Sequence, residues 1–150
     1  MRKTYVIVGG VAGGASFAAR LRRLDETCHI IMFERGEYVS FANCGLPYYV
    51  GGTITEKDHL ILQTPEEIQD KFNINIHIQT EVTNIIPESK KVIAKNLITG
   101  EIIETVYDQL ILSPGATPFI PNIQGLSSAS NLFTLRTIPD SVKIKESIKA

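Results

Sequence analysis

A strand, a glycine-rich turn, a helix and a second strand follow one another over residues 5–34, and this order constrains the fold more than any other feature. The run Tyr5–Val8 is short, apolar and rich in β-forming residues, which is typical of a strand buried on both faces. It ends at the glycine-rich turn 9–14, and a helix is expected next. The run Ile30–Phe33 predicts a second buried strand that closes with Glu34. The alternation predicts an α/β fold with a parallel central sheet.

The turn between the first strand and the helix has the features of a dinucleotide-binding site. Gly9 permits a tight exit from the strand, and Gly14 has no side chain to hold the helix away from it. Val11 stands where such turns usually carry their middle glycine, and its β-branched side chain limits how closely a phosphate can approach. Glu34 follows Gly14 by twenty residues, where a carboxylate accepts hydrogen bonds from ribose hydroxyls and repels a 2′-phosphate.

The helix after the turn is expected to carry two stripes at helical spacing. The first is apolar and consists of Phe17, Leu21 and Leu24. The second is polar and basic, and it consists of Ser16, Arg20 and Arg23. Two arginines on one face suit bidentate recognition of phosphates, although a solvated helix face has the same pattern.

The stretch 40–49 contains one cysteine among small and polar residues. Pro47 is tolerated in the first turn of a helix, so Cys44 is expected near a helix N-terminus. The partial positive charge there favours the thiolate, which makes a cysteine a nucleophile. The alternative is a small buried residue that enters a helix. Cys28 comes just before a predicted strand and is expected to be inert.

The remaining segments predict a mixed architecture. Thr64, Pro65 and Glu67 form a capping box for a short helix that ends near residues 71–72. Short loops separate three β-rich runs, which predict an antiparallel meander and span 81–86, 91–97 and 101–106. The strand 110–112 is expected to return to the parallel sheet. A final helix is expected over 141–150. It has no glycine or asparagine C-cap signal, which favours a chain that has been truncated.

Composition excludes several classes of function. The net charge of −1 gives no electrostatic signal for nucleic acid or an anionic membrane, and no apolar run approaches membrane-spanning length. Two cysteines are too few for a disulfide scaffold, and we expect reduced thiols in a cytoplasmic setting. His29, His59 and His77 have no metal-site spacing, so no metal is expected.

Together these motifs resemble the flavoprotein disulfide reductases, which have two dinucleotide-binding domains. The residues that carry the resemblance are 9–14, Glu34, 40–44, 112–116 and 134–136. The match is to the single-cysteine branch, which comprises CoA-disulfide reductases, NADH oxidases and peroxidases, and persulfide or polysulfide reductases. Ser40 stands where lipoamide-type members have the first of two paired cysteines. The resemblance therefore implies that the redox partner of Cys44 comes from outside.

The resemblance also implies a domain organisation. It predicts a Rossmann-like, three-layer FAD/NAD(P)-binding fold with an inserted antiparallel β-meander. Residues 1–116 would form the FAD-binding segment, with the meander at about 79–107. Residues 117–150 would be a connector toward a missing NAD(P)H-binding domain, which makes this a truncated chain.

The same resemblance assigns site residues. Cys44 would be catalytic. The residues expected to bind FAD are Gly9, Gly10, Val11, Ala12, Gly13, Gly14, Glu34, Arg35, Asn43, Val82, Ser113, Pro114 and Gly115. Those expected to bind the substrate are Ser16, Arg20, Arg23, Ser40 and Asn43.

The implied function is the FAD-dependent reduction of CoA disulfide, or of a CoA-linked persulfide or polysulfide, through a mixed disulfide on Cys44. NADH or NADPH would be the co-substrate, and the full-length enzyme would be a homodimer. One alternative is an NADH oxidase or peroxidase that uses a cysteine sulfenic acid. Another is an isolated fragment without enzyme activity.

Overall fold

The computed structural model describes residues 2–149, and its contacts divide the chain into two compact units. The first consists of Met1–Phe41 and Gln63–Gly115, and the second of Ala42–Leu62 and Ala116–Ala150. Each unit is therefore assembled from two separate stretches of sequence, and the cysteine stretch is divided between them after residue 41.

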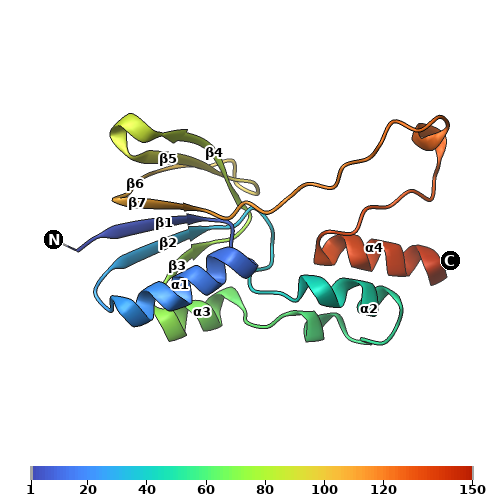
Figure 1. The fold of residues 1–150 in the computed structure, drawn as a ribbon, viewed down its shortest axis with the longest axis horizontal. Helices are drawn as coiled ribbons and strands as arrows, with labels where there is room; N and C mark the ends of the chain where they lie inside the picture. The colour runs from blue at the N-terminus through green and yellow to red at the C-terminus, as the bar shows by residue number, and fades with distance from the viewer. Residues whose placement is uncertain (1, 150) are drawn as a thin grey trace. The chain divides into compact units, whose positions relative to one another are not determined.

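The first unit is built on a four-stranded parallel sheet (Figure 1). Its strands run in the order β3-β2-β1-β7, and their bounds are β1 Thr4–Val8, β2 His29–Phe33, β3 Asn75–His77 and β7 Gln109–Leu112. The two central strands are paired in register, with Val6 opposite Ile31. Val6 and Ile7 point to opposite faces and are both fully buried. This confirms the prediction of a sheet covered on both faces.

Helices α1 (Ala12–Leu24) and α3 (Pro65–Phe72) belong to the same unit, and the predicted apolar stripe of α1 is not the face that the helix buries. Phe17 is 38% exposed and Leu24 is 69% exposed. The buried face instead carries Gly14 and Ala18, with Leu21 partly buried against the core. Small residues occupy the buried face because they let the helix axis approach the sheet closely, which large side chains would prevent.

The capping box of α3 is confirmed. The Glu67 N–H donates to Thr64 Oγ1 at 3.2 Å, and the Thr64 N–H donates to Glu67 Oε2 at 2.8 Å. Asn73 ends the helix in the left-handed region at φ +49°. The helix therefore has defined signals at both ends.

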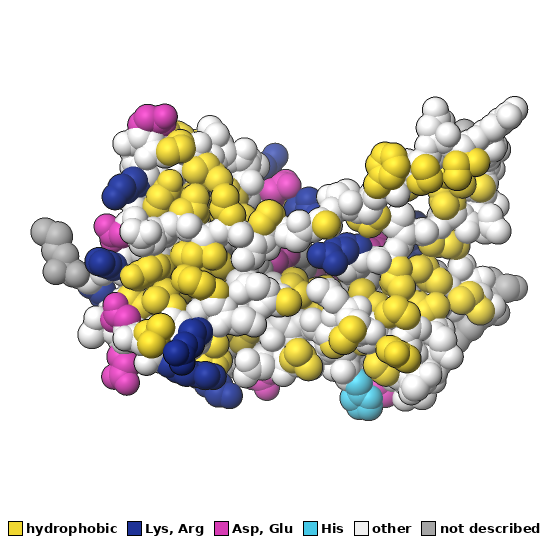
Figure 2. Space-filling view, in the orientation of Figure 1, with side chains coloured by type: hydrophobic (Ala, Val, Ile, Leu, Met, Phe, Trp, Pro, Cys, Tyr) yellow, Lys and Arg dark blue, Asp and Glu magenta, His cyan; other side chains and the backbone are white. Residues whose placement is uncertain are grey.

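The predicted meander forms the second sheet of this unit. Its strands are β4 Thr80–Ile86, β5 Lys91–Asn96 and β6 Ile102–Val106, joined as consecutive antiparallel neighbours. Val92 and Ala94 pack into one cluster with Val6 and Phe33 of the parallel sheet. Helices, parallel sheet and meander are thus three layers, as predicted (Figure 1). Hydrophobic side chains gather on the outside of the meander, where Val106 is 62% exposed (Figure 2).

The second unit is mostly helical. It contains the 3-10 turns η1 Asn43–Gly45, η2 Lys57–Leu60 and η4 Leu126–Ser128 and the helices α2 Leu46–Val50 and α4 Ile138–Lys149. Helix α4 begins before the predicted boundary at residue 141, because the Thr137 N–H donates to Asp140 Oδ2 at 2.8 Å and caps its first turn. No helix within residues 2–149 is long and apolar enough to cross a membrane.

Candidate functional site

At two positions of the glycine turn, backbone atoms occupy the space that a side chain would need. Gly9 has φ +96°, and a Cβ atom there would overlap the Ser113 carbonyl oxygen. A Cβ atom on Gly14 would overlap the Gly9 carbonyl oxygen. The strand, the turn and the end of β7 therefore meet at backbone contact distance, which only glycine permits.

Helix α1 begins at this turn without any side-chain cap. Val11 is the N-cap residue and makes no side-chain hydrogen bond, and the first turn holds no acidic residue. The first N–H groups of a helix have no partner inside the helix, and together with the helix dipole they attract anions. An uncapped helix end lined by Ala12, Gly13 and Gly14 is suited to bind an anionic group such as a pyrophosphate.

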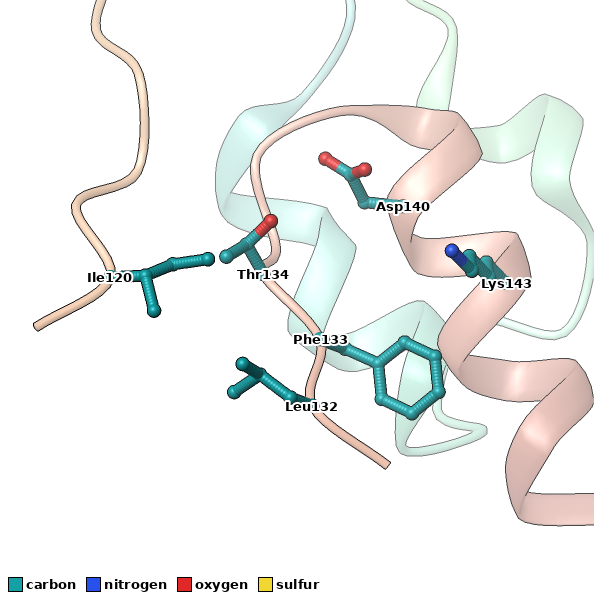
Figure 3. Close-up of a pocket in the computed structure, with 6 residues that line it drawn as sticks. All are labelled: Ile120, Leu132, Phe133, Thr134, Asp140 and Lys143. Carbon is teal, nitrogen blue, oxygen red and sulfur yellow. The ribbon is translucent and has the colours of Figure 1, made fainter. Parts of the chain in front are cut away.

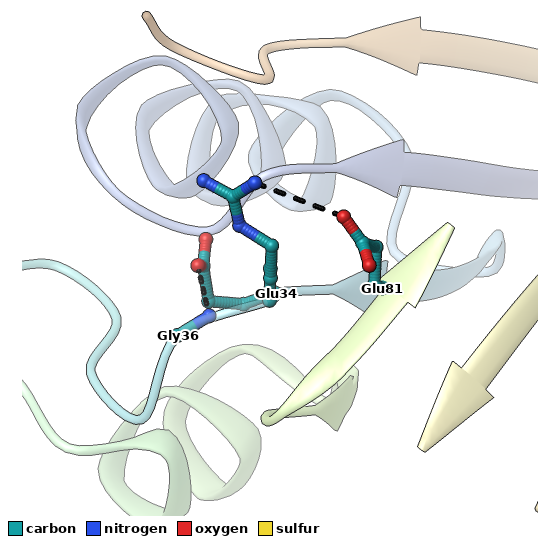
Figure 4. Close-up of polar contacts among 4 residues, drawn as sticks. Glu34, Gly36 and Glu81 are labelled. Atoms are coloured by element: carbon teal, nitrogen blue, oxygen red, sulfur yellow. Dashed lines mark hydrogen bonds and ion pairs between the residues drawn. The ribbon is translucent and has the colours of Figure 1, made fainter. Parts of the chain in front are cut away.

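Glu34 directly follows β2 and accepts hydrogen bonds from the glycine turn and from Gly36, the second of which is drawn in Figure 4. The Gly10 N–H donates to Glu34 Oε2 at 2.7 Å, and the Gly36 N–H donates to Glu34 Oε1 at 2.6 Å. Each carboxylate oxygen therefore already accepts one hydrogen bond. A carboxylate accepts about four in all, so capacity for ribose hydroxyls is left.

The neighbouring predicted residues are Arg35 and Val82. Arg35 is exposed, and its Nη1 lies 3.7 Å from Glu81 Oε1 (Figure 4). Val82 is half-buried against the cluster between the two sheets, and the β4–β5 register shifts just after it. Both residues lie near Glu34, because the Thr80 N–H donates to the Glu34 carbonyl at 2.9 Å.

The end of β7 brings a further predicted group to the turn. The Ser113 N–H donates to the Val8 carbonyl at 2.8 Å, and its Oγ would lie 3.1 Å from a Cβ atom on Gly13. Pro114 follows it and is exposed, and Gly115 has φ +72°. The structure therefore gathers the predicted residues of the turn, Glu34 and Ser113 at the carboxyl ends of neighbouring parallel strands, where α/β sheets bind ligands.

The predicted substrate residues of the first unit divide into two groups. Ser16, Arg20 and Arg23 are exposed on α1, and neither arginine has an ion-pair partner among the described residues. Ser40 is held at the turn instead, because its N–H donates to the Gly10 carbonyl at 3.0 Å. Its φ of +46° is uncommon for a residue other than glycine.

Cys44 and Asn43 belong to the second unit. Cys44 is an exposed free thiol in turn η1, directly before helix α2, which has Pro47 in its first turn as expected. The Asn43 Oδ1 atom is buried and has no hydrogen-bond partner within residues 2–149. Buried polar atoms are rarely left unpaired, so this oxygen is suited to accept a hydrogen bond from a bound molecule.

Cys28 has the opposite environment. It is fully buried in the core of the first unit, where its Sγ donates to the Asp25 carbonyl at 3.2 Å. Burial raises the pKa of the Cys28 thiol, which opposes formation of the thiolate. The inert role predicted for this cysteine agrees with its surroundings.

Two features of the structure were not predicted. Arg22 donates to the carbonyls of Phe72, Asn73 and Cys28, and it thereby joins the ends of α1, α3 and the loop before β2. The position of Arg22 in the last turn of α1 could have indicated these contacts, because arginines there often bind free carbonyl groups. A cavity of about 150 Å³ also lies in the second unit (Figure 3). It is lined by Ile120, Leu132, Phe133, Thr134, Asp140 and Lys143.

The polar edge of this cavity is charged. Burial opposes ionisation of Asp140, but hydrogen bonds from Thr137 and Arg136 outweigh it and hold the pKa of that carboxyl below its usual value. None of the lining residues is a predicted site residue, and no group of three or more metal-ligating side chains occurs in the part of the chain described here.

Known proteins share both the sequence and the fold. A coenzyme A disulfide reductase from Staphylococcus aureus strain JH9 is 42% identical over 145 residues, which are 97% of this chain and 32% of that protein. The structure of reduced CoADR-RHD from Bacillus anthracis matches with a TM-score of 0.96 and 54% identity, over 99% of this chain and 27% of that one. A NAD-dependent persulfide reductase from A. fulgidus matches with a TM-score of 0.90 and 35% identity, over 97% of this chain and 27% of that one.

This chain therefore spans about a third of the length of the curated relative, 32%. The family described as pyridine nucleotide-disulphide oxidoreductase matches residues 3–150, which is nearly the whole chain. Its members use FAD together with NADH or NADPH, which agrees with the cofactors that the resemblance of the sequence implies. The three-layer fold, the uncapped α1 turn and these matches lead to one conclusion: the chain belongs to the pyridine nucleotide-disulphide oxidoreductase family.

Proposed function

We propose that this protein reduces CoA disulfide, or a CoA-linked persulfide or polysulfide, through the single redox-active cysteine Cys44. One observation carries the proposal: Cys44 is exposed while Cys28, the other cysteine of these 150 residues, is fully buried. Ser40 stands where a paired cysteine would allow an internal disulfide. An exposed thiol without a paired cysteine is accessible to the sulfur atoms of a disulfide or persulfide substrate.

The residues of the turn would hold FAD. The α1 N-terminus suits the pyrophosphate, and Glu34 suits the adenosine ribose. Ser113 and Gly115 would let the cofactor approach the backbone closely, and Asn43 Oδ1 would accept a hydrogen bond from the cofactor or the substrate. The chemistry that bound FAD supplies is the transfer of two electrons from NADH or NADPH to the sulfur that has reacted.

The steps at Cys44 consume only the two electrons that NADH or NADPH would supply through FAD and two protons from solvent. Its thiolate attacks one sulfur of the external disulfide, so that a new S–S bond forms and the old one breaks. The first thiol leaves with a proton from solvent. Two electrons then break the mixed disulfide, which restores the Cys44 thiolate and releases the second thiol after it takes up a proton. Arg20 and Arg23 would bind the phosphates of the CoA group on the exposed face of α1.

The test is NADH or NADPH consumption by the purified holoenzyme, with CoA disulfide, CoA persulfide, hydrogen peroxide and oxygen compared as acceptors. Cys44→Ser should abolish turnover of CoA disulfide while FAD stays bound, and Cys28→Ala should retain it. Turnover of CoA disulfide by Cys44→Ser would refute the proposal. Faster turnover of peroxide or oxygen than of any disulfide or persulfide would favour the oxidase or peroxidase reaction.

The setting and assembly are also part of the proposal. Free cysteines fit the reducing cytoplasm, and the family resemblance supports a homodimer. We further propose that these 150 residues alone lack turnover, because the chain spans 27–32% of the related proteins.

A further inference from the structure

Helix α4 holds the helix that follows Cys44 through one lysine. The Lys145 ammonium lies 3.7 Å from the centre of the Tyr49 ring, and it donates to the Thr55 carbonyl at 3.3 Å. Tyr49 belongs to α2, and α2 and α4 lie side by side in the second unit (Figure 1). Lys145 therefore contacts both α2 and the loop that leaves it.

Helix α2 needs such support because it is very short. It has five residues, Leu46–Val50, and a helix of that length is not stable by itself in water. Leu46 is 2% exposed and Tyr49 is 9% exposed, so packing decides how the helix is oriented. A cation over an aromatic ring is a strong contact when it is partly shielded from water, as it is here for both partners.

The turn before α2 is fixed from another direction. Gly45 packs so closely that a Cβ atom there would lie 2.8 Å from Leu60 Cδ2. The Ala42 N–H also donates to the Leu60 carbonyl at 2.8 Å. Turn η2 thus holds the cysteine turn on both sides of Cys44, whereas Lys145 holds the helix α2 that follows this turn. The exposed thiol of Cys44 stands between two fixed points along the chain.

We propose that Lys145 is a positioning residue for Cys44: by binding the Tyr49 ring and the Thr55 carbonyl, it fixes the orientation of α2 and hence of the cysteine turn. The inference rests on the proposed function, in which Cys44 is the redox residue. It gives the segment 117–150 a part in the reaction beyond that of a connector, because α4 would hold the cysteine helix in its working orientation.

The first test is hydrogen exchange measured by mass spectrometry on the holoenzyme. The Gly51 N–H donates to the Pro47 carbonyl at 2.9 Å and the Ile54 N–H to the Tyr48 carbonyl at 3.1 Å, so these amides report on α2. Lys145→Met keeps most of the apolar stem but removes the cation. It should speed their exchange by about 3- to 30-fold, the range expected for loss of a cation–π contact.

Lys143→Met is the matched control. This lysine lies on the same helix, but it is exposed and its ammonium lies 5.9 Å from the ring of Phe133, which is not part of α2. The control should leave the exchange of residues 45–55 unchanged. Equal exchange in Lys145→Met and Lys143→Met would overturn the proposal, whatever the enzyme's substrate is.

The second test separates positioning from general stability. With CoA disulfide as acceptor, Lys145→Met should lower kcat about 3- to 30-fold and leave KM within about twofold. Lys145→Arg should restore kcat, because a guanidinium also binds an aromatic face. Alkylation of the buried Cys28 should stay as slow as in the wild type. An unchanged kcat, no rescue by arginine, or faster Cys28 alkylation would each overturn the proposal. If the wild-type enzyme reduces no disulfide or persulfide, the proposed function is refuted, and the positioning role in that reaction is refuted with it. The hydrogen-exchange comparison does not depend on the substrate, so it would still test whether Lys145 holds α2.

Discussion

Replacing Glu34 by glutamine tests how the glycine turn is held. The carboxylate accepts one N–H from Gly10 at 2.7 Å and another from Gly36 at 2.6 Å. Glutamine keeps one acceptor oxygen, so one N–H loses its partner and the other loses a charged one. A hydrogen bond to a charged group contributes about 1.5–3 kcal/mol and a neutral one about 1 kcal/mol. Because Glu34 is only half-buried, water replaces part of the loss, and we expect about 1–2 kcal/mol less stability.

The assay is urea unfolding of the FAD-free protein, followed by circular dichroism, with exchange of the Gly10 and Gly36 amides as a local measure. Glu37→Gln is the matched control, because Glu37 is exposed and removal of its charge should change stability by less than about 0.5 kcal/mol. If Glu34→Gln and Glu37→Gln unfold at the same urea concentration, and the Gly10 amide exchanges no faster, then the carboxylate does not hold the turn.

Two further substitutions test the packing of the same unit. Gly14→Ala should cost about 3 kcal/mol or more in urea unfolding, because its Cβ atom would overlap the Gly9 carbonyl. Gly13→Ala should stay within about 1 kcal/mol, because its Cβ atom would meet only the Ser113 side chain, with Oγ at 3.1 Å and Cβ at 3.3 Å, and a small shift relieves both contacts. Similar losses for both would contradict this reading. Burial lowers the pKa of His77 from 6.5, so the unfolded chain takes up the proton first and stability should fall as the pH drops below about 6.5. His77→Gln should flatten this part of the stability profile measured from pH 7.5 to 5, and an unchanged slope would count against it.

Local signals predicted those parts of the fold that depend on neighbouring residues. The capping box at Thr64, the strand–turn–helix order and the three meander strands are each encoded within a few residues, and all are present. The core face of α1 was missed for a physical reason. Hydrophobic spacing gives weight to large side chains such as Phe17, whereas close contact with a sheet selects small ones such as Gly14 and Ala18.

Contacts between distant segments could not be predicted in this way. Arg22 binds the Asn73 carbonyl from fifty-one residues away, and Lys145 binds Thr55 from ninety. The sequence near Arg22 or Lys145 does not indicate these contacts, because the packing of the helices determines which carbonyl each side chain reaches. The hydrogen bonds of the candidate site could not be predicted either. The pattern located Glu34 twenty residues after Gly14, but only the structure reveals that its carboxylate binds the Gly10 and Gly36 amides.

The two cysteines show why burial, and not residue type, decides the chemistry proposed here. Cys28 is fully buried, its thiol donates to the Asp25 carbonyl, and burial raises its pKa, so three features keep it protonated and out of reach. Cys44 is exposed. A second accessible thiol would compete with the external sulfur for Cys44, because an internal disulfide forms at a high effective concentration. Because Cys28 is buried and position 40 carries serine, Cys44 has no internal competitor among the described residues, and this supports the proposed mixed disulfide with a thiol from outside.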